Sequence, residues 1–258
     1  MTETDGPVRI EKLEDGVIWR ATLATPKANI LDIEKTRLLT DLFERARAAT
    51  GLKAVIIEGE GPHFSFGASV QEHLPDRVEA MLREFHHLFY AMLDSSVITL
   101  AAVRGQCLGG GMELAAFCHR VFAAPDAKLG QPEIVLGVFA PVASVMLAER
   151  TGRGPADDLC LSGRTIGADE ALAIGLVDQL ADDPGAAALQ YAREYLLPRS
   201  ASSLRYAVRA ARHGFGERLR SALAEVERLY LEELMSTADA LEGLEAFLEK
   251  RQPSWKNR

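Results

Sequence analysis

The sequence of 258 residues predicts an α/β fold in which buried strands alternate with helices around a largely parallel sheet. Two short β-branched runs, 52–57 and 97–103, predict buried strands, and each follows a segment of helical apolar spacing, at 32–51 and 76–93. Strands that alternate with helices join through right-handed crossovers and therefore lie parallel. Beyond residue 141 the pattern is almost wholly helical, so this part must pack against the sheet.

The composition is that of an ordinary globular protein and excludes several classes of function. A formal net charge of −8 argues against a general nucleic-acid surface, which needs clustered Lys and Arg. The chain has no run of about 18 apolar residues, and its acidic beginning lacks an apolar core. We therefore expect no membrane span and no secretion, and the cytoplasm is the expected compartment.

Cysteine and histidine predict neither a disulfide framework nor a metal site. Three cysteines lie far apart without a CxxC pair. Six histidines include the adjacent pair His86 and His87, but neighbours on a helix point about 100° apart and do not readily chelate one metal. We therefore expect no metal.

The N-terminal part predicts a hairpin, a loop and a capped helix. Residues 8–24 alternate apolar and polar side chains around an Asp-Gly dipeptide, which is the signal of a β-hairpin. The stretch 25–29, which includes Pro26, breaks this pattern as a loop. Asp32 can cap the following helix, which the pattern ends at Gly51.

The stretch GQCLGGGMELAAFC, residues 105–118, follows the strand at 97–103 directly. Three consecutive glycines lower helix and strand propensity, but they let a ligand or another backbone come close to the main chain. The apolar run after them predicts a buried helix, whose N-terminus presents free N–H groups and a partial positive charge. A further strand is predicted at 120–124.

The C-terminal half predicts a series of helices at 142–151, 155–161, 168–174, 185–197 and 200–213. Only 176–180 interrupts them as a possible strand. From 217 to 249 apolar residues recur as a helical stripe, which we expect to pack against the protein's own core.

The glycines do not match the motifs that bind nucleotide phosphates. Gly105 and Gly110 have the P-loop separation, but Gly111 and Met112 follow where Lys and Ser or Thr are required. A GxGxxG fingerprint is also missing from this stretch. A pair of N–H donors near a carboxylate remains, which is the equipment for stabilising an oxyanion while a proton moves.

Two glutamates stand in apolar surroundings 20 positions apart. Glu113 lies in the first turn of the helix after the glycines, and Glu133 lies in LGQPEIVLG, where the preceding proline interrupts a regular strand. Each could be structural, Glu113 through the helix dipole and Glu133 through an arginine such as Arg104 or Arg120. Together with the glycines, they indicate a catalytic acid–base pair.

Several motifs resemble the crotonase (enoyl-CoA hydratase/isomerase) superfamily. HFSFGASVQEH is similar to its F-x-x-G-A-D loop, and the stretch QCLGGGMELAAFCHRVFAAPDAKLGQPEIVLG resembles its central segment. The resemblance runs from PKANIL to the terminal FLEKRQPSWKNR. It implies a spiral of ββα units over 1–195 and a C-terminal helical region over 196–258 that assembles a homotrimer or a homohexamer.

The resemblance also implies roles for residues of the glycine-rich turns. The backbone amides of Ala68 and Gly110 correspond to the oxyanion hole that holds a thioester carbonyl as it becomes an enolate. Glu113 and Glu133 correspond to the two carboxyl groups that orient water and exchange a proton with the substrate carbon. The implied activity is hydration of an α,β-unsaturated acyl-CoA.

An acyl-CoA thioester is the implied partner, with coenzyme A as part of the substrate and no separate cofactor. The implied coenzyme A contacts are Lys27, Ala28, Ala68, Ser69 and Val70. We expect the acyl pocket to be shaped by Phe66, Phe139 and Pro141.

Two departures from the family pattern narrow the activity. Ser69 stands where many members have Asp, and GVFAPVAS, residues 137–144, replaces the usual G-x-x-P-G-A-G. Pro141 therefore falls where a glycine N–H would help to hold the attacking water, and proline has none. The combination resembles the branch that hydrates ring-shaped dienoyl-CoA thioesters in anaerobic aromatic degradation. A straight-chain enoyl-CoA hydratase, an enoyl-CoA isomerase or a non-catalytic acyl-CoA-binding protein are the alternatives.

Overall fold

A seven-stranded sheet forms the centre of the computed structural model, which describes residues 2–3, 6–25 and 27–258. Pro26, part of the predicted loop, lies outside the described residues. The strand order is β1-β2-β3-β4-β5-β7-β10. Their bounds are Thr2–Glu3, Val8–Leu13, Ile18–Leu23, Ala54–Gly59, Ile98–Val103, Arg120–Ala123 and Gln179–Leu180, in that order.

The sheet is antiparallel at one edge and parallel elsewhere. β1 pairs with β2 and β2 with β3 in antiparallel fashion, and the 3-10 turn Glu14–Gly16 closes the predicted hairpin. From β3 through β4, β5, β7 and β10 every pairing is parallel. The alternation of strands and helices therefore predicted the sheet correctly.

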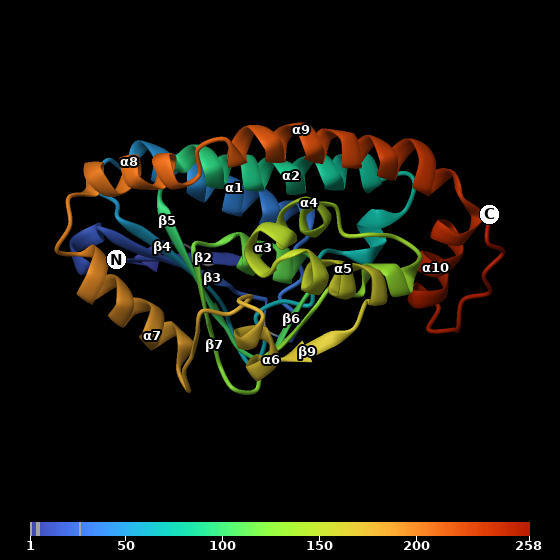
Figure 1. Ribbon diagram of the computed structural model, residues 1–258, viewed down its shortest axis with the longest axis horizontal. Coiled ribbons are helices and arrows are strands. Elements are labelled where there is room, and N and C mark those ends of the chain that lie inside the picture. The colour runs from blue at the N-terminus through green and yellow to red at the C-terminus, as the bar shows by residue number, and fades with distance from the viewer. Residues whose placement is uncertain (1, 4–5, 26) are drawn as a thin grey trace.

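Helices cover both faces of this sheet (Figure 1). One face packs against α1 (Ile33–Ala48), α2 (Val78–Ser95) and α3 (Gly110–Phe117), and the other against α7 (Pro184–Tyr191) and the π-helix Ala192–Leu196. Alternate residues of β4 enter the two cores, because successive side chains of a strand point to opposite faces.

A second, three-stranded sheet is the part of the fold that the sequence did not predict. It consists of β6 (Gln106–Leu108), β8 (Lys128–Gly130) and β9 (Thr165–Gly167), in that order. β6 pairs with β8 in parallel, and the Gly109 amide continues this contact by donating to the Gly130 carbonyl at 2.9 Å. The segments that carry the two glutamates therefore begin side by side.

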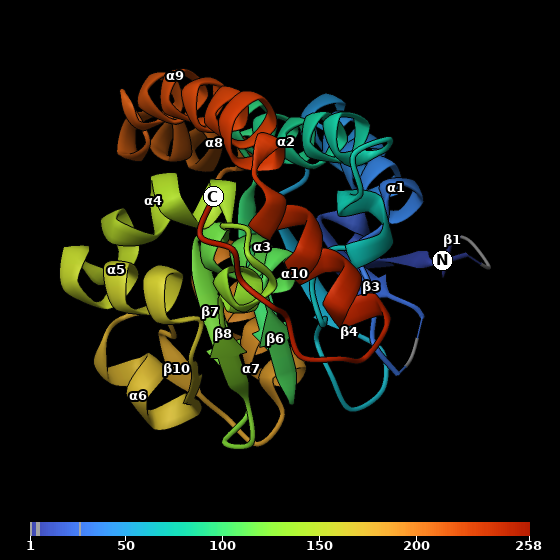
Figure 2. The same ribbon diagram turned by 90° about the vertical axis from the view of Figure 1, so that its right-hand side faces the viewer.

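The C-terminal helices pack back onto the rest of the chain (Figures 1 and 2). The remaining helices are α4 (Pro141–Thr151), α5 (Arg153–Ser162), α6 (Ala168–Ala173), α8 (Ala201–Ala211), α9 (Phe215–Arg228) and α10 (Ala238–Leu248). α9 lies along α2, and α10 packs against the 3-10 segments Val70–His73 and Pro132–Leu136. In the described part of the chain, no helix combines the length and the apolar character that crossing a bilayer requires.

One predicted strand was too long for a local reason. The strand expected at 176–180 is only Gln179–Leu180, because the amides of Leu176 and Val177 bond to the Ala171 carbonyl and close the end of α6. The predicted stripe at 217–249 is divided between helices, and Thr237 caps α10 by accepting from the Ala240 amide. The stripe nevertheless buries Leu219, Leu223, Tyr230 and Leu244 in the protein's own core.

Candidate active site

The loop from Phe64 to Ser69 is held against the chain by hydrogen bonds of a buried serine. The Ser65 hydroxyl donates to the Asn29 carbonyl at 2.8 Å and accepts from the Gly67 amide at 3.0 Å. The Phe66 amide donates to the Ala28 carbonyl at 2.9 Å. These bonds fix the backbone of the turn that leads into Ala68.

The amides of Ala68 and Gly110 lie beside each other. A Cβ placed on Gly110 would stand 3.3 Å from the Ala68 nitrogen, and one placed on Gly67 would stand 3.3 Å from the Gly110 nitrogen. Neither amide donates a hydrogen bond to another residue that the structure describes. Gly109, at φ 50° and ψ −129°, turns the chain so that α3 begins at Gly110. Two free donors, of which that of Gly110 lies at a helix start, can receive an oxyanion.

Glu113 lies in the first turn of α3 with its side chain buried. Its Oε1 accepts from the Ala143 amide at 2.7 Å, and the Val142 amide also hydrogen-bonds to the carboxylate. Both amides belong to the first turn of α4, where such groups have no partner within the helix. Burial raises the pKa of Glu113, and the two amides oppose that rise in pKa only in part.

Glu133 lies on the 3-10 helix that follows β8, next to the glycines. A Cβ on Gly109 would collide with its Oε1, and its Oε2 is buried with no hydrogen-bond partner among the described residues. Burial, and then the charge of Glu113, raises the pKa of Glu133. Two carboxyl groups in one apolar place resist double ionisation, so they share a proton near neutral pH.

The structural alternative for Glu133 was wrong. Arg104 instead pairs with Asp183 at 3.2 Å, and the Arg120 guanidinium stacks on the Tyr191 ring at 4.7 Å. Glu133 forms no ion pair with any residue that the structure describes. No neighbouring cation therefore neutralises it.

A cavity of about 570 Å³ opens beside Glu133 and the two turns. Most of its walls are apolar, and they include Val70, Leu108, Val135, Leu136 and Phe247. Of the predicted coenzyme A contacts, Ala28, Ala68, Ser69 and Val70 line it, whereas Lys27 is exposed and does not.

Of the three residues predicted to shape the acyl pocket, one lines the cavity and two do not. Phe66 lines the cavity and is 40% exposed. Phe139 packs edge-to-face on Tyr230, with the ring centroids 5.1 Å apart, and Pro141 is the first residue of α4. Neither Phe139 nor Pro141 is among the residues that line the cavity.

Sequence reasoning missed several residues of the site. The amides of Val142 and Ala143 could have been found, since a proline at 141 signals a helix start with free donors behind it. His73, whose Nδ1 lies 2.8 Å from the Ser69 carbonyl, also lines the cavity. Tyr230 and Phe247 reach the site from the C-terminal helices, and no local pattern predicts that.

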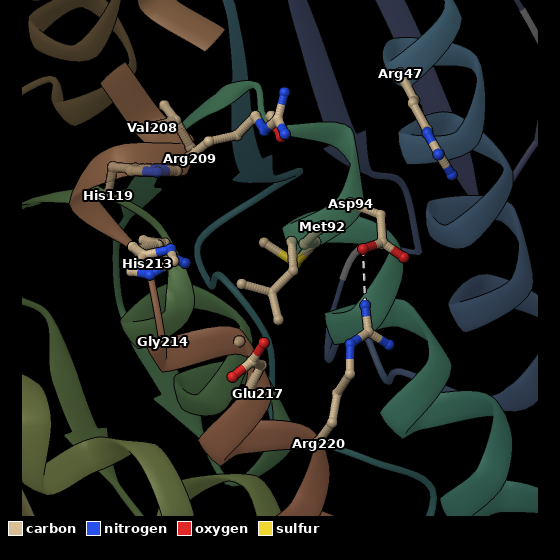
Figure 3. Close-up of a pocket in the computed structure, with 14 residues that line it drawn as sticks. Arg47, Met92, Asp94, His119, Val208, Arg209, His213, Gly214, Glu217 and Arg220 are labelled. Carbon is tan, nitrogen blue, oxygen red and sulfur yellow. Dashed lines mark hydrogen bonds and ion pairs between the residues drawn. The ribbon is translucent and has the colours of Figure 1, made fainter. Parts of the chain in front are cut away.

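A second cavity of about 570 Å³ lies between α2, α8 and α9 (Figure 3). Two of the arginines that line it are engaged: Arg220 pairs with Asp94 at 2.7 Å, and Arg212 donates to the Phe117 carbonyl at 2.9 Å. Neither Glu113 nor Glu133 lines it, and neither Ala68 nor Gly110 does. Glu133 and Ala68 instead line the first cavity, whereas Glu113 and Gly110 are not among its lining residues.

Comparison with known proteins defines the class. Residues 14–258 match the family model described as Enoyl-CoA hydratase/isomerase. An enoyl-CoA hydratase from Mycobacterium avium subsp. paratuberculosis superposes with a TM-score of 0.85 at 26% identity, covering 98% of this chain and 99% of that one. The chain belongs to the enoyl-CoA hydratase/isomerase family, and the predicted crotonase fold is confirmed.

Individual relatives lie within this family. The chain is 53% identical over 258 residues, the whole of both chains, to the cyclohexa-1,5-dienecarbonyl-CoA hydratase of Thauera aromatica. It is 35% identical over 243 residues to a probable enoyl-CoA hydratase of Mycobacterium bovis, covering 92% of this chain and 93% of that one.

Proposed function

We propose that the chain hydrates cyclohexa-1,5-diene-1-carbonyl-CoA to 6-hydroxycyclohex-1-ene-1-carbonyl-CoA. One arrangement carries this proposal: Glu133 and Ala68 line one apolar cavity, and the free Gly110 amide lies beside that of Ala68. The buried Glu113 does not line the cavity but is close enough for its charge to raise the pKa of Glu133. The identity of 53% to the Thauera aromatica hydratase supports the ring-shaped substrate.

The amides of Ala68 and Gly110 hold the thioester oxygen. Negative charge develops there when hydroxide adds to the conjugated system, and the N-terminus of α3 adds a partial positive charge. Each preorganised donor of this kind contributes ~10²- to 10³-fold in rate. The hydrogen bonds of Ser65 serve this step by fixing the turn.

The glutamate pair moves the proton. One carboxylate takes a proton from water as the hydroxyl bonds to the β-carbon, and the electron pair shifts through the diene onto the thioester oxygen. The other, protonated carboxyl then gives its proton to the far end of the diene. The raised pKa of both groups supports this division, because it keeps one carboxyl protonated near neutral pH.

The coenzyme A part extends along Ala28, Ser69 and Val70, and the exposed Lys27 supplies a cation for its phosphates. The ring enters between Phe66 and the apolar wall. Phe139 and Pro141 shape the pocket from behind, through the segments that hold the glutamates. All transferred atoms come from substrate, water and carboxyl groups, so the reaction needs no separate cofactor.

Turnover of the purified protein on the cyclic dienoyl-CoA and on crotonyl-CoA tests this substrate. We expect faster turnover of the ring substrate, with a single hydroxylated product. Faster hydration of crotonyl-CoA would reject the ring assignment in favour of a straight-chain hydratase. Turnover of neither, together with no deuterium exchange into a bound acyl-CoA, would favour a non-catalytic binding protein.

For assembly we propose a homotrimer, or a homohexamer of two trimers, formed through the helical region 196–258. The exposed apolar side chains Tyr206, Leu229 and Phe247 of this region support it. Sedimentation equilibrium measures the mass directly, and a monomer would contradict it.

A further inference from the structure

Tyr230 carries a hydroxyl that the fold itself does not use. The residue lies in the π-helix Leu229–Glu233 after α9, and its side chain is 0% exposed. Its hydroxyl is buried without a hydrogen-bond partner among the described residues. A buried, unpaired hydroxyl destabilises a fold relative to an apolar group of the same shape. Phenylalanine would therefore serve packing better at this position.

The ring of Tyr230 packs against the short segment that supports both glutamates. It contacts the Phe139 ring edge-to-face, with the centroids 5.1 Å apart. On one side of Phe139, the Val138 amide donates to the Glu133 carbonyl at 3.2 Å. On the other side, α4 begins and holds the Glu113 carboxylate. Tyr230 therefore lies behind the acid–base pair.

The charges around Tyr230 keep its hydroxyl protonated. Burial, and then the charges of Glu133 and Glu113, raises the pKa of the phenol. Cys160 is a further titratable group that senses both glutamates, and burial with their charges raises its pKa to about 12. The tyrosine and the thiol thus stay neutral near neutral pH, where the raised pKa values of the two carboxyl groups lie.

Two groups in this region lack partners and complement each other. The phenol hydroxyl is a donor, and the buried Oε2 of Glu133 is an acceptor. We propose that Tyr230 is a positioning residue whose hydroxyl hydrogen-bonds to Glu133 Oε2 through one water and so lowers the proton affinity of that carboxyl. The inference rests on the proposed hydration, in which Glu113 and Glu133 share one proton.

The proposed hydrogen bond should change the proton affinity of the carboxyl pair in one direction. A donor stabilises the ionised carboxylate, so the bond lowers the proton affinity of the pair. Without the hydroxyl, the pair holds its proton to higher pH. Glu133, the carboxyl that keeps the proton, is then a weaker acid, so kcat falls and the alkaline limb of the rate profile moves upward.

Tyr230→Phe tests the proposal, with Tyr191→Phe as a matched control. Tyr191 packs on the Phe122 ring at 5.8 Å, on the other face of the sheet. For Tyr230→Phe we expect kcat on the dienoyl-CoA to fall about tenfold or more, an alkaline limb at higher pH and little change in KM. The Tm should stay equal or rise. The control should match wild type in the pH profile.

A carboxyl titration by difference infrared spectroscopy provides a readout without turnover. The apparent pKa of the pair should be higher in Tyr230→Phe, and the hydroxyl's effect should vanish in a Glu133→Gln background. If wild type turns over neither substrate but this shift is present, the proposed reaction fails and the hydrogen bond stands. A fall in kcat with an unchanged pH profile and unchanged carboxyl titration would show a packing role and overturn the proposal.

Discussion

At the scale of single residues, the two glutamates differ in what stabilises their charge. Two amides of α4 hydrogen-bond to Glu113, whereas Oε2 of Glu133 has no partner among the described residues. Hydrogen bonds to a carboxylate favour its ionised form, and the repulsion between the pair raises the pKa of Glu133 further. We therefore assign Glu113 as the base that accepts the water proton and Glu133 as the acid.

Removing either carboxyl should abolish most of the activity without unfolding the protein. We expect Glu113→Gln and Glu133→Gln each to lower kcat by ~10²- to 10⁴-fold, because each removes one proton-transfer group. The Tm should not fall much, since a buried charge is removed as well. Glu149→Gln, which breaks an exposed ion pair with Arg218, is the control. Wild-type kcat in Glu133→Gln would refute its role as the acid.

The same pair should make stability depend on pH. Burial raises the pKa of Glu113 to about 7, and burial with the charge of Glu113 raises that of Glu133 to about 8, both from an ordinary 4.5. Between the ordinary pKa of 4.5 and these raised values, the folded state binds more protons than the unfolded state. The free energy of unfolding therefore falls as pH rises through this range. This contribution to stability is fully present below the pKa of the unfolded state, and it is lost as pH rises through the two pKa values of the folded state.

Urea unfolding at a series of pH values from about 5 to about 8 measures this slope. The double variant Glu113→Gln/Glu133→Gln should show a flatter dependence than wild type over this range. Equal slopes in the two proteins would mean that the carboxyl groups are ionised in the fold at neutral pH.

At the scale of elements, the site depends on how helices begin. α3 begins at Gly110 and presents its amide, and α4 begins at Pro141 and binds the Glu113 carboxylate. Both starts are visible in the sequence, one as a glycine run and the other as a proline before an apolar run. The sequence does not show that the start of α4 binds a carboxylate of α3, because this contact arises only when α3 and α4 pack together.

The turn at Gly109, which starts α3, can be tested by substitution. Gly109→Ala places a methyl group at positive φ and against Glu133 Oε1, so the carboxyl must move. We expect kcat to fall at least tenfold and stability to fall by ~1 kcal/mol or more. Gly154→Ala, whose Cβ meets nothing within 4 Å, should keep both values or gain slightly in stability. Activity equal to wild type in Gly109→Ala would place Glu133 outside the reaction.

The elements also show what sequence could and could not predict. The hairpin, α1 and α2 follow from apolar periodicity, because each buries one regular face. The parallel strands β4, β5 and β7 and the helix α3 follow from short apolar runs. The strands β6, β8 and β9 have three residues each, which is too short for a period to appear. The glutamates and glycines were found from residue chemistry, whereas their cavity depends on contacts between distant segments.

At the scale of the whole molecule, the C-terminal helices complete the site of their own chain. Tyr230 packs behind the glutamates, and Phe247 of α10 lines the cavity beside Val135 and Leu136. The division into a core of 1–195 and a helical region of 196–258 therefore describes chain order, and we propose that the second part also closes the acyl pocket. Figure 2 shows α10 crossing this end of the molecule.

Phe247 tests this closure. Its side chain is 53% exposed, so Phe247→Ala removes little from the core and should leave the Tm nearly unchanged. Contact of the ring with bound substrate is worth ~1 kcal/mol, so we expect KM for the dienoyl-CoA to rise about fivefold with a smaller change in kcat. Tyr206→Ala, an exposed aromatic residue of α8 that does not line the cavity, should leave KM as it is. If KM is the same in Phe247→Ala as in Tyr206→Ala, α10 covers the cavity without contacting substrate. Specificity must then come from Phe66 and the 3-10 segment Pro132–Leu136 alone.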